Sequence, residues 1–194
     1  AILVLAAGFY VIFLAGLLKG RKASSEAALK YAVYGAGAIG GHLAMRLHKG
    51  GADVSVIARG AHLAAIRDRG LTVHAADGHH HARLRATSDP AELGAQNAVF
   101  VTVKAPALPE VARGIGPLLG PDTPVCFVMN GIPWWYFQGL PGPHADRSLP
   151  RIDPDDALKR ALGPGRALGG VVYSASEVTA PRVIEAEQPK SRFI

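Results

Sequence analysis

Three glycines, Gly35, Gly37 and Gly40, lie between a short apolar run and an amphipathic run in the stretch YAVYGAGAIGGHLAMRL. In a turn from a strand into a helix, Gly35 would permit the bend, Gly37 would admit an anion, and Gly40 would let the helix pack closely. The free backbone N–H groups of the helix start attract phosphate. Because the flanking runs supply the strand and the helix, the pattern predicts a dinucleotide site rather than a structural glycine-rich turn. The predicted phosphate-binding residues are Gly35, Ala36, Gly37, Ala38, Ile39 and Gly40.

Arg59, which ends the next β-type run in the stretch VIARG, indicates which dinucleotide binds. An acidic residue at this place would accept hydrogen bonds from the ribose 2′-OH of NAD. The sequence has no carboxylate adjacent to Arg59, and a guanidinium can hold a 2′-phosphate through two parallel hydrogen bonds. We therefore predict NADP(H) as the cofactor, with His62 as a second group at the phosphate. The alternative is that Arg59 is a solvated charge at the end of a strand.

These residues need a framework, and the chain from residue 31 alternates β-type and helical runs. The run NAVFVTVK is so continuously apolar that both of its faces should be covered by other elements. Strand–helix alternation over this length predicts an α/β protein with a doubly wound, Rossmann-type parallel sheet. The predicted strands are 31–35, 52–59, 97–104, 123–131, 167–178 and 182–188, and the predicted helices are 38–51, 60–70, 107–120 and 155–163.

A histidine triplet, residues 79–81, follows the only Asp-Gly step of the alternating stretch 71–87. Asp77 and Gly78 predict a hairpin turn, which places the triplet at the hairpin tip as part of a solvated loop. Consecutive residues on a turn or strand point in different directions, so they make a poor metal site. We expect no metal.

Composition limits the function classes. The 194 residues carry a formal net charge of +6, and 49% of them are hydrophobic, which is typical of a chain with a folded core. The arginines are scattered and form no dense run with aromatic residues, so we expect no nucleic-acid partner. The single cysteine, Cys126, cannot form an internal disulfide and fits a reduced compartment or a buried thiol.

The first 18 residues, AILVLAAGFYVIFLAGLL, carry no charge, and KGRK follows them. This length reaches the lower limit for a membrane-spanning helix, and basic residues after the span favour the cytoplasmic side. A buried helix or a stretch unrelated to the domain would explain the same pattern. We expect an apolar helix and polar linker over residues 1–30 and a globular domain over residues 31–194.

Four stretches, YGAGAIGGHLA, VIARGAHLAAI, VTVKA and NGIPWW, resemble the ketopantoate reductase (2-dehydropantoate 2-reductase) family in their order and spacing. The resemblance extends over residues 31–194. Many dehydrogenases share the glycine motif, whereas its combination with VKA and NG is more specific. The resemblance implies an NADPH-binding Rossmann domain, followed by a helical C-terminal domain, that reduces 2-dehydropantoate to (R)-pantoate on the way to pantothenate and coenzyme A.

By this resemblance, Lys104 and Asn130 line the active-site cleft near the nicotinamide. Both follow strands that end at the same edge of a parallel sheet, where such sheets bind ligands. Lys104 would attract a carboxylate or phosphate, and Asn130 would hydrogen-bond the carboxamide or the substrate. The alternatives are an exposed strand-end lysine and an Asn-Gly turn. Pro106 and Ala107 depart from a stretch that often contains glutamine in the family, which weakens the expected contact with the adenine ribose.

The resemblance assigns the general-acid lysine and its partner glutamate to the C-terminal helical domain, beyond Ile194. Lys159 and Lys190 match no such motif. We therefore expect this chain to be a fragment that binds NADP(H) with little or no turnover. A non-catalytic or membrane-tethered NADP-binding module, and a reductase of another 2-oxo acid, are the alternative functions.

The expected partner is a small 2-oxo acid substrate. A homodimer and an attachment to the inner face of a membrane through residues 1–18 are left open, and the expected location is the cytoplasm. Four aromatic residues after Asn130, residues 134–137, would either line the substrate cleft or an interface, or form a small core cluster under the proline-rich loop.

Overall fold

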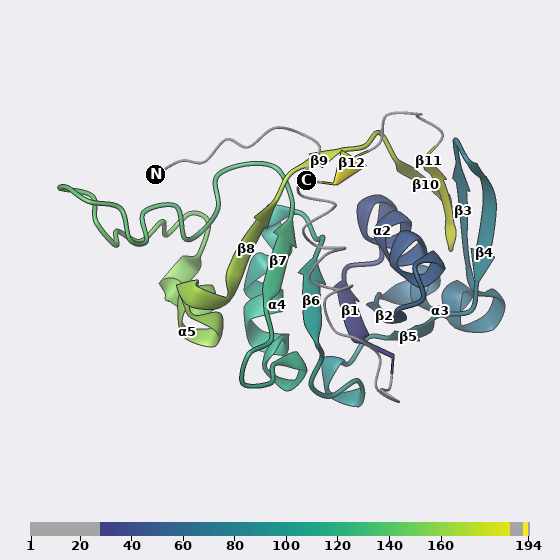
Figure 1. Ribbon diagram of the computed structural model, residues 1–194, viewed down its shortest axis with the longest axis horizontal. Coiled ribbons are helices and arrows are strands. Elements are labelled where there is room, and N and C mark those ends of the chain that lie inside the picture. Colours follow the sequence, from purple (N-terminus) through teal and green to yellow (C-terminus); the bar gives the residue numbers. More distant parts are fainter. Residues whose placement is uncertain (1–27, 187–191, 194) are drawn as a thin grey trace.

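The computed structural model describes residues 28–186 and 192–193. Its main sheet consists of β1 (Lys30–Tyr34), β2 (Asp53–Ile57), β5 (Arg85–Thr87), β6 (Ala98–Val101), β7 (Val125–Val128) and β8 (Ala167–Gly170). All neighbours are parallel and the order is β5-β2-β1-β6-β7-β8 (Figure 1). Because the order proceeds outward from β1 in both directions, the doubly wound Rossmann-type sheet is confirmed.

Helices cover both faces of this sheet. They are α2 (Ala38–Lys49), α3 (Gly60–Arg69), α4 (Leu108–Gly114) and α5 (Ala157–Leu162). Alternate residues of β1 point to opposite faces, so Val33 joins the core that contains α2 and α3, and Ala32 joins the core that contains α4 and α5. Both residues are fully buried, as expected for a strand covered on each side. Short 3-10 turns occur at Pro90–Glu92, Ala105–Ala107, Gly116–Leu118, Pro154–Asp156 and Pro164–Arg166.

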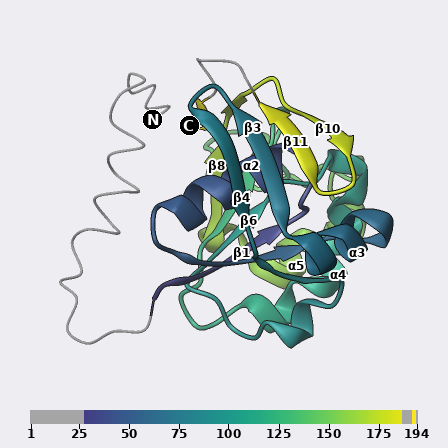
Figure 2. The same cartoon turned by 90° about the vertical axis from the view of Figure 1, so that its right-hand side faces the viewer.

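A second sheet covers the outer side of α2, and the sequence did not predict it. It contains β3 (Leu71–Ala75), β4 (Gly78–Ala82), β10 (Glu177–Ala180) and β11 (Val183–Ala186), in the order β10-β11-β3-β4. The two hairpins meet where β11 pairs in parallel with β3 (Figure 2). A further short pair joins β9 (Val172–Tyr173) to β12 (Arg192–Phe193).

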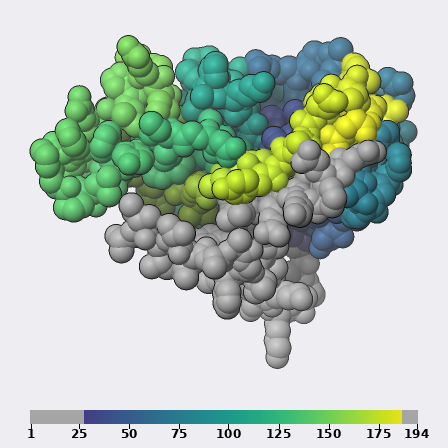
Figure 3. Space-filling model, turned by 90° about the horizontal axis from the view of Figure 1, so that it is seen from above, coloured from purple at the N-terminus to yellow at the C-terminus, as the bar shows by residue number. Residues whose placement is uncertain are grey.

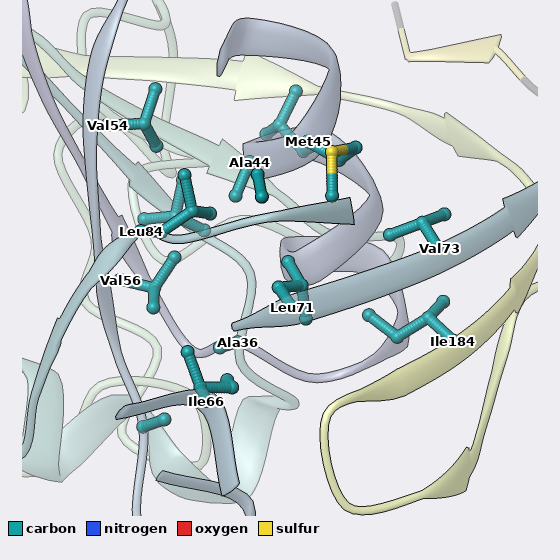
Figure 4. Packing of buried hydrophobic residues seen from close by; sticks show 14 of the residues in the cluster. Ala36, Ala44, Met45, Val54, Val56, Ile66, Leu71, Val73, Leu84 and Ile184 are labelled. Carbon is teal, nitrogen blue, oxygen red and sulfur yellow. The ribbon is translucent and has the colours of Figure 1, made fainter. Parts of the chain in front are cut away.

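Apolar side chains fill the space between the second sheet and α2. Leu71 and Ile184 of the sheet and Met45 of the helix are almost completely buried in one cluster (Figure 4). A Cβ atom at Gly41 would lie 2.1 Å from Cδ1 of Ile184, so the absence of a side chain there allows the close contact. The second sheet therefore holds α2 against the main sheet.

The expected placement of the histidine triplet in a loop was wrong. The hairpin turn comprises residues 76 and 77, and residues 79–81 lie in β4, where His79 pairs with His74 and His80 with Val73. The turn lies one residue before the Asp-Gly step in the chain, and its second residue, Asp77, accepts a hydrogen bond from Arg46 of α2, with 2.9 Å between Nη2 and Oδ1. This contact also keeps the pKa of Asp77 well below its usual range.

Two other predicted elements are shorter than expected. The helix predicted at 107–120 ends at Gly114 and gives way to the 3-10 turn Gly116–Leu118, because Pro117 has no N–H group to continue the α-helical hydrogen bonds. The strand predicted at 167–178 divides among β8, β9 and β10, since the chain leaves the main sheet after Gly170.

Cys126 lies on β7, and its partial burial raises the pKa of the thiol to about 11. Among the residues described, none of the helices has the length and apolar character needed to cross a bilayer. The helix expected over residues 1–18 lies outside this part of the chain. Within residues 28–186 and 192–193, no group of His, Cys, Asp and Glu is arranged to hold a metal ion.

Candidate dinucleotide-binding site

The turn between β1 and α2 is closely packed at two of its glycines. Gly35 has a φ of +105°, which side-chain-bearing residues rarely adopt, and a Cβ there would lie 2.7 Å from Cγ1 of Val103. A Cβ at Gly40 would lie 1.9 Å from the carbonyl oxygen of Gly35. The Thr102 hydroxyl donates to that carbonyl at 2.6 Å, which fixes the turn to the end of β6. The glycine spacing therefore sets how closely α2 approaches the sheet.

Gly37, by contrast, faces open space. No atom lies within 4 Å of the position that a Cβ would take. Gly37 is the N-cap of α2, no side chain caps the helix, and the first turn contains no acidic residue. The N–H groups of the first helical turn thus have no side-chain acceptor, and the helix dipole places partial positive charge there. This end of α2 has the properties of an anion site.

A cavity of about 370 Å³ opens beside the glycine turn. Its walls include Gly35 and Gly37, the end of β2 with Arg59, and Glu110 from α4. It lies at the carboxyl ends of β1 and β2, beside the point where the strand order reverses, which is where open α/β sheets bind ligands. The structure thus brings together the glycine turn and Arg59, as the sequence predicted that a dinucleotide site would require.

Arg59 has a partner that the sequence did not indicate. Its Nη1 atom lies 2.6 Å from Oε2 of Glu110, and the two side chains are 68% and 42% exposed. Glu110 is remote in sequence, which is why a search for a carboxylate next to Arg59 missed it. The sequence did contain one indication of this partner. Glu110 lies in the first turn of a helix that follows a neighbouring strand of the sheet, and the first turns of such helices line the same crevice as the glycine turn.

His62 supports the glycine turn. One ring nitrogen, Nδ1, accepts a hydrogen bond from the backbone N–H of Arg182 at 3.0 Å. The proton must therefore be on Nε2, which donates to the carbonyl of Ala36 at 2.7 Å. Both nitrogens bond to backbone, so His62 links the second sheet to the turn, and its predicted contact with a phosphate stays a prediction.

Replacing His62 with alanine is expected to lower the free energy of unfolding by about 1–3 kcal/mol, because two partly buried backbone groups lose their partner. Urea unfolding of the variant measures this change. His48→Ala is the matched control. His48 is exposed on α2, so its replacement should leave the free energy of unfolding unchanged. Equal stabilities of the two variants would contradict the supporting role of His62.

Lys104 and Asn130 lie at the ends of adjacent strands but do not line the cavity. Lys104 is exposed, and its side chain makes no hydrogen bond or ion pair within the described part of the chain. The Asn130 carboxamide is bonded to Val172, donating to its carbonyl at 3.1 Å and accepting from its N–H at 3.0 Å. It thereby positions the start of β9. The predicted roles of both residues near a nicotinamide stay predictions.

The aromatic residues 134–137 divide between the core and the surface. Trp134 is only 3% exposed and packs edge-on against Phe127 of β7, so it belongs to the core on the α4 side. Tyr136 is 52% exposed. The loop that carries these residues projects at one end of the molecule, in green in Figure 3, away from β10 and β11.

Comparisons with known proteins agree with this architecture. The sequence profile of the family described as ketopantoate reductase PanE/ApbA matches residues 31–193. A 2-dehydropantoate 2-reductase from Mesorhizobium japonicum is 44% identical over 163 residues, which cover 84% of this chain and 50% of that protein. The chain thus spans about half the length of this curated relative.

Solved structures show the same fold. A protein from Ralstonia solanacearum MolK2, described as a candidate ketopantoate reductase, has a TM-score of 0.78 and 41% identity, with coverage of 84% of this chain and 50% of that one. The 2-dehydropantoate 2-reductase from Porphyromonas gingivalis W83 has a TM-score of 0.66 and 28% identity, with coverage of 86% and 54%. The family profile and the two relatives above 40% identity together show that the chain belongs to the ketopantoate reductase family.

Proposed function

We propose that this chain is the NADP(H)-binding part of a 2-dehydropantoate 2-reductase. Such an enzyme reduces 2-dehydropantoate to (R)-pantoate, a step toward pantothenate and coenzyme A. The observation that carries the proposal is the cavity whose walls include both Gly37, at the uncapped start of α2, and Arg59. Family membership supports the reaction class.

The residues around the cavity fit a phosphorylated dinucleotide. Gly37 leaves space for a diphosphate against the backbone, and the first turn of α2 offers its N–H groups. Arg59, more than half exposed, is able to turn toward a 2′-phosphate. Ala107 forms part of the wall without offering a polar side chain, so more of the selection between NADP(H) and NAD(H) falls to Arg59.

The bound nicotinamide would supply the hydride for the ketone carbon of the substrate. Lys104 would attract the substrate carboxylate, because its ammonium group is exposed and has no partner among the described residues. Asn130 would shape the same edge of the sheet through its bonds to Val172. The proposal assigns the proton donor to the half of the relatives that this chain does not match, so we expect little or no turnover by the chain alone.

The test is a calorimetric titration of the chain with NADPH and with NADH. We expect NADPH to bind at least about tenfold more tightly, because a charge-assisted pair to the 2′-phosphate contributes more than about 1.4 kcal/mol. Failure of both dinucleotides to bind would refute the proposed function. Titrating the NADP⁺-loaded chain with a panel of 2-oxo acids then distinguishes 2-dehydropantoate from other substrates.

A further inference from the structure

Glu110 places a second charge at the predicted 2′-phosphate position. Its carboxylate oxygen Oε2 lies 2.6 Å from Nη1 of Arg59, and both residues line the cavity beside the glycine turn. Glu110 extends from the first turn of α4, while Arg59 ends the β2 side of the same opening. The carboxylate therefore accepts a hydrogen bond at one edge of the guanidinium that would bind the phosphate.

Breaking the ion pair between Arg59 and Glu110 would cost little free energy. Both side chains are substantially exposed, and exposed ion pairs contribute little to stability because water screens them. An incoming phosphate would carry nearly two negative charges, so it would outcompete one carboxylate for Arg59. The displaced carboxylate would still lie beside the phosphate, and like charges at this separation weaken binding.

The same carboxylate suits a different ligand. A ribose 2′-OH needs a hydrogen-bond acceptor, and acidic residues supply it in sites for NAD. In this chain no acidic residue is adjacent to Arg59 in the sequence, but Glu110 brings one to the same place from α4. The cavity thus contains a guanidinium suited to the phosphate and a carboxylate suited to the hydroxyl.

We propose that Glu110 is a specificity-determining residue, whose carboxylate competes with the 2′-phosphate of NADPH for Arg59 and accepts a hydrogen bond from the 2′-OH of NADH. Glu110 thereby reduces the ratio of NADPH affinity to NADH affinity that Arg59 creates. This inference rests on the proposed function, since it concerns the selectivity of the same site.

The experiment compares dissociation constants for NADPH and NADH in the full chain and in Glu110→Gln. The substitution keeps the size of the side chain and removes the charge. We expect NADPH to bind about fivefold more tightly to Glu110→Gln, because the competing exposed pair is lost, and NADH to bind no more tightly. An unchanged unfolding midpoint would show that the effect is local to the site.

A matched pair elsewhere supplies the control. Arg67 and Glu92 approach to 3.9 Å, with exposures of 51% and 50%, and neither lines the cavity. Glu92→Gln should leave both dissociation constants unchanged. In an Arg59→Ala background, Glu110→Gln should improve NADPH affinity by less than it does in the unsubstituted chain, since there is no guanidinium to compete for and only the direct repulsion between the carboxylate and the phosphate is relieved.

The outcomes separate the two claims. If neither dinucleotide binds to the unsubstituted chain, the proposed function fails. If NADPH is preferred but its preference over NADH is the same in Glu110→Gln, the inference about Glu110 is wrong and the proposed function stands. If Glu92→Gln changed the dissociation constants for NADPH and NADH as much as Glu110→Gln does, the inference would also be wrong, because the effect would come from the net charge of the chain alone.

Discussion

Gly40→Ala is expected to abolish dinucleotide binding and to lower the free energy of unfolding by about 1–3 kcal/mol, the usual cost of overpacking. The added Cβ would lie 1.9 Å from the Gly35 carbonyl oxygen and 2.3 Å from Oγ1 of Thr102. A backbone carbonyl cannot turn aside as a flexible side chain would, so α2 must move away from the turn. Calorimetric titration with NADPH and urea unfolding measure the two effects.

Two other glycines make this prediction specific. Gly37→Ala should fold normally, because its Cβ meets no atom within 4 Å, but should weaken binding by filling the space proposed for the diphosphate. Gly116→Ala, also in open space but outside the cavity, should change neither stability nor binding. Full binding by Gly37→Ala would count against the proposed position of the dinucleotide.

Arg59→Ala is expected to remove the preference for NADPH, with a loss of about 10- to 100-fold in NADPH affinity and less than about threefold in NADH affinity. Hydrogen bonds to a charged group are usually worth about 1.5–3 kcal/mol, and the 2′-phosphate is the only group in which the two dinucleotides differ. The preference of the unsubstituted chain should also decline at high ionic strength, because Arg59 is 68% exposed.

Arg69→Ala is the control for this substitution. Arg69 lies at the end of α3, is similarly exposed, and pairs with Asp68 outside the cavity. It should lose little affinity for either dinucleotide. Equal affinities for NADPH and NADH in the unsubstituted chain would show that Arg59 does not select the cofactor.

The parts of the fold that sequence could predict depend on local patterns. The glycine spacing, the amphipathic run after it and the continuously apolar strands are patterns within a few residues, and they predicted β1, β2, β6, β7 and the residues of β8, but not the edge strand β5. The second sheet depends on β11 pairing with β3, and no local pattern names that partner: His74 and Glu185, 111 positions apart, lie side by side. The second sheet therefore could not be predicted from local sequence patterns.

In the candidate site too, local sequence patterns indicate some residues but not the remote residues that they contact. Gly35, Gly37 and Arg59 were identifiable because their residue types have characteristic roles at strand ends. The partner of Arg59 is 51 positions away, and the partner of Asn130 is 42 positions away. The sequence could place the positive charge of Arg59 at the site, but it could not show that the carboxylate of Glu110 pairs with that charge.

The late position of β11 in the chain affects how the protein must form during synthesis. The helix that follows the glycine turn is complete once residue 49 has been made, but the strand that seals its outer side ends at residue 186. While the ribosome adds the intervening residues, the apolar surface that will meet Ile184 has no cover. A partly synthesised chain that lacks β11 therefore leaves this apolar surface of α2 open to contact with other chains, as incomplete domains do.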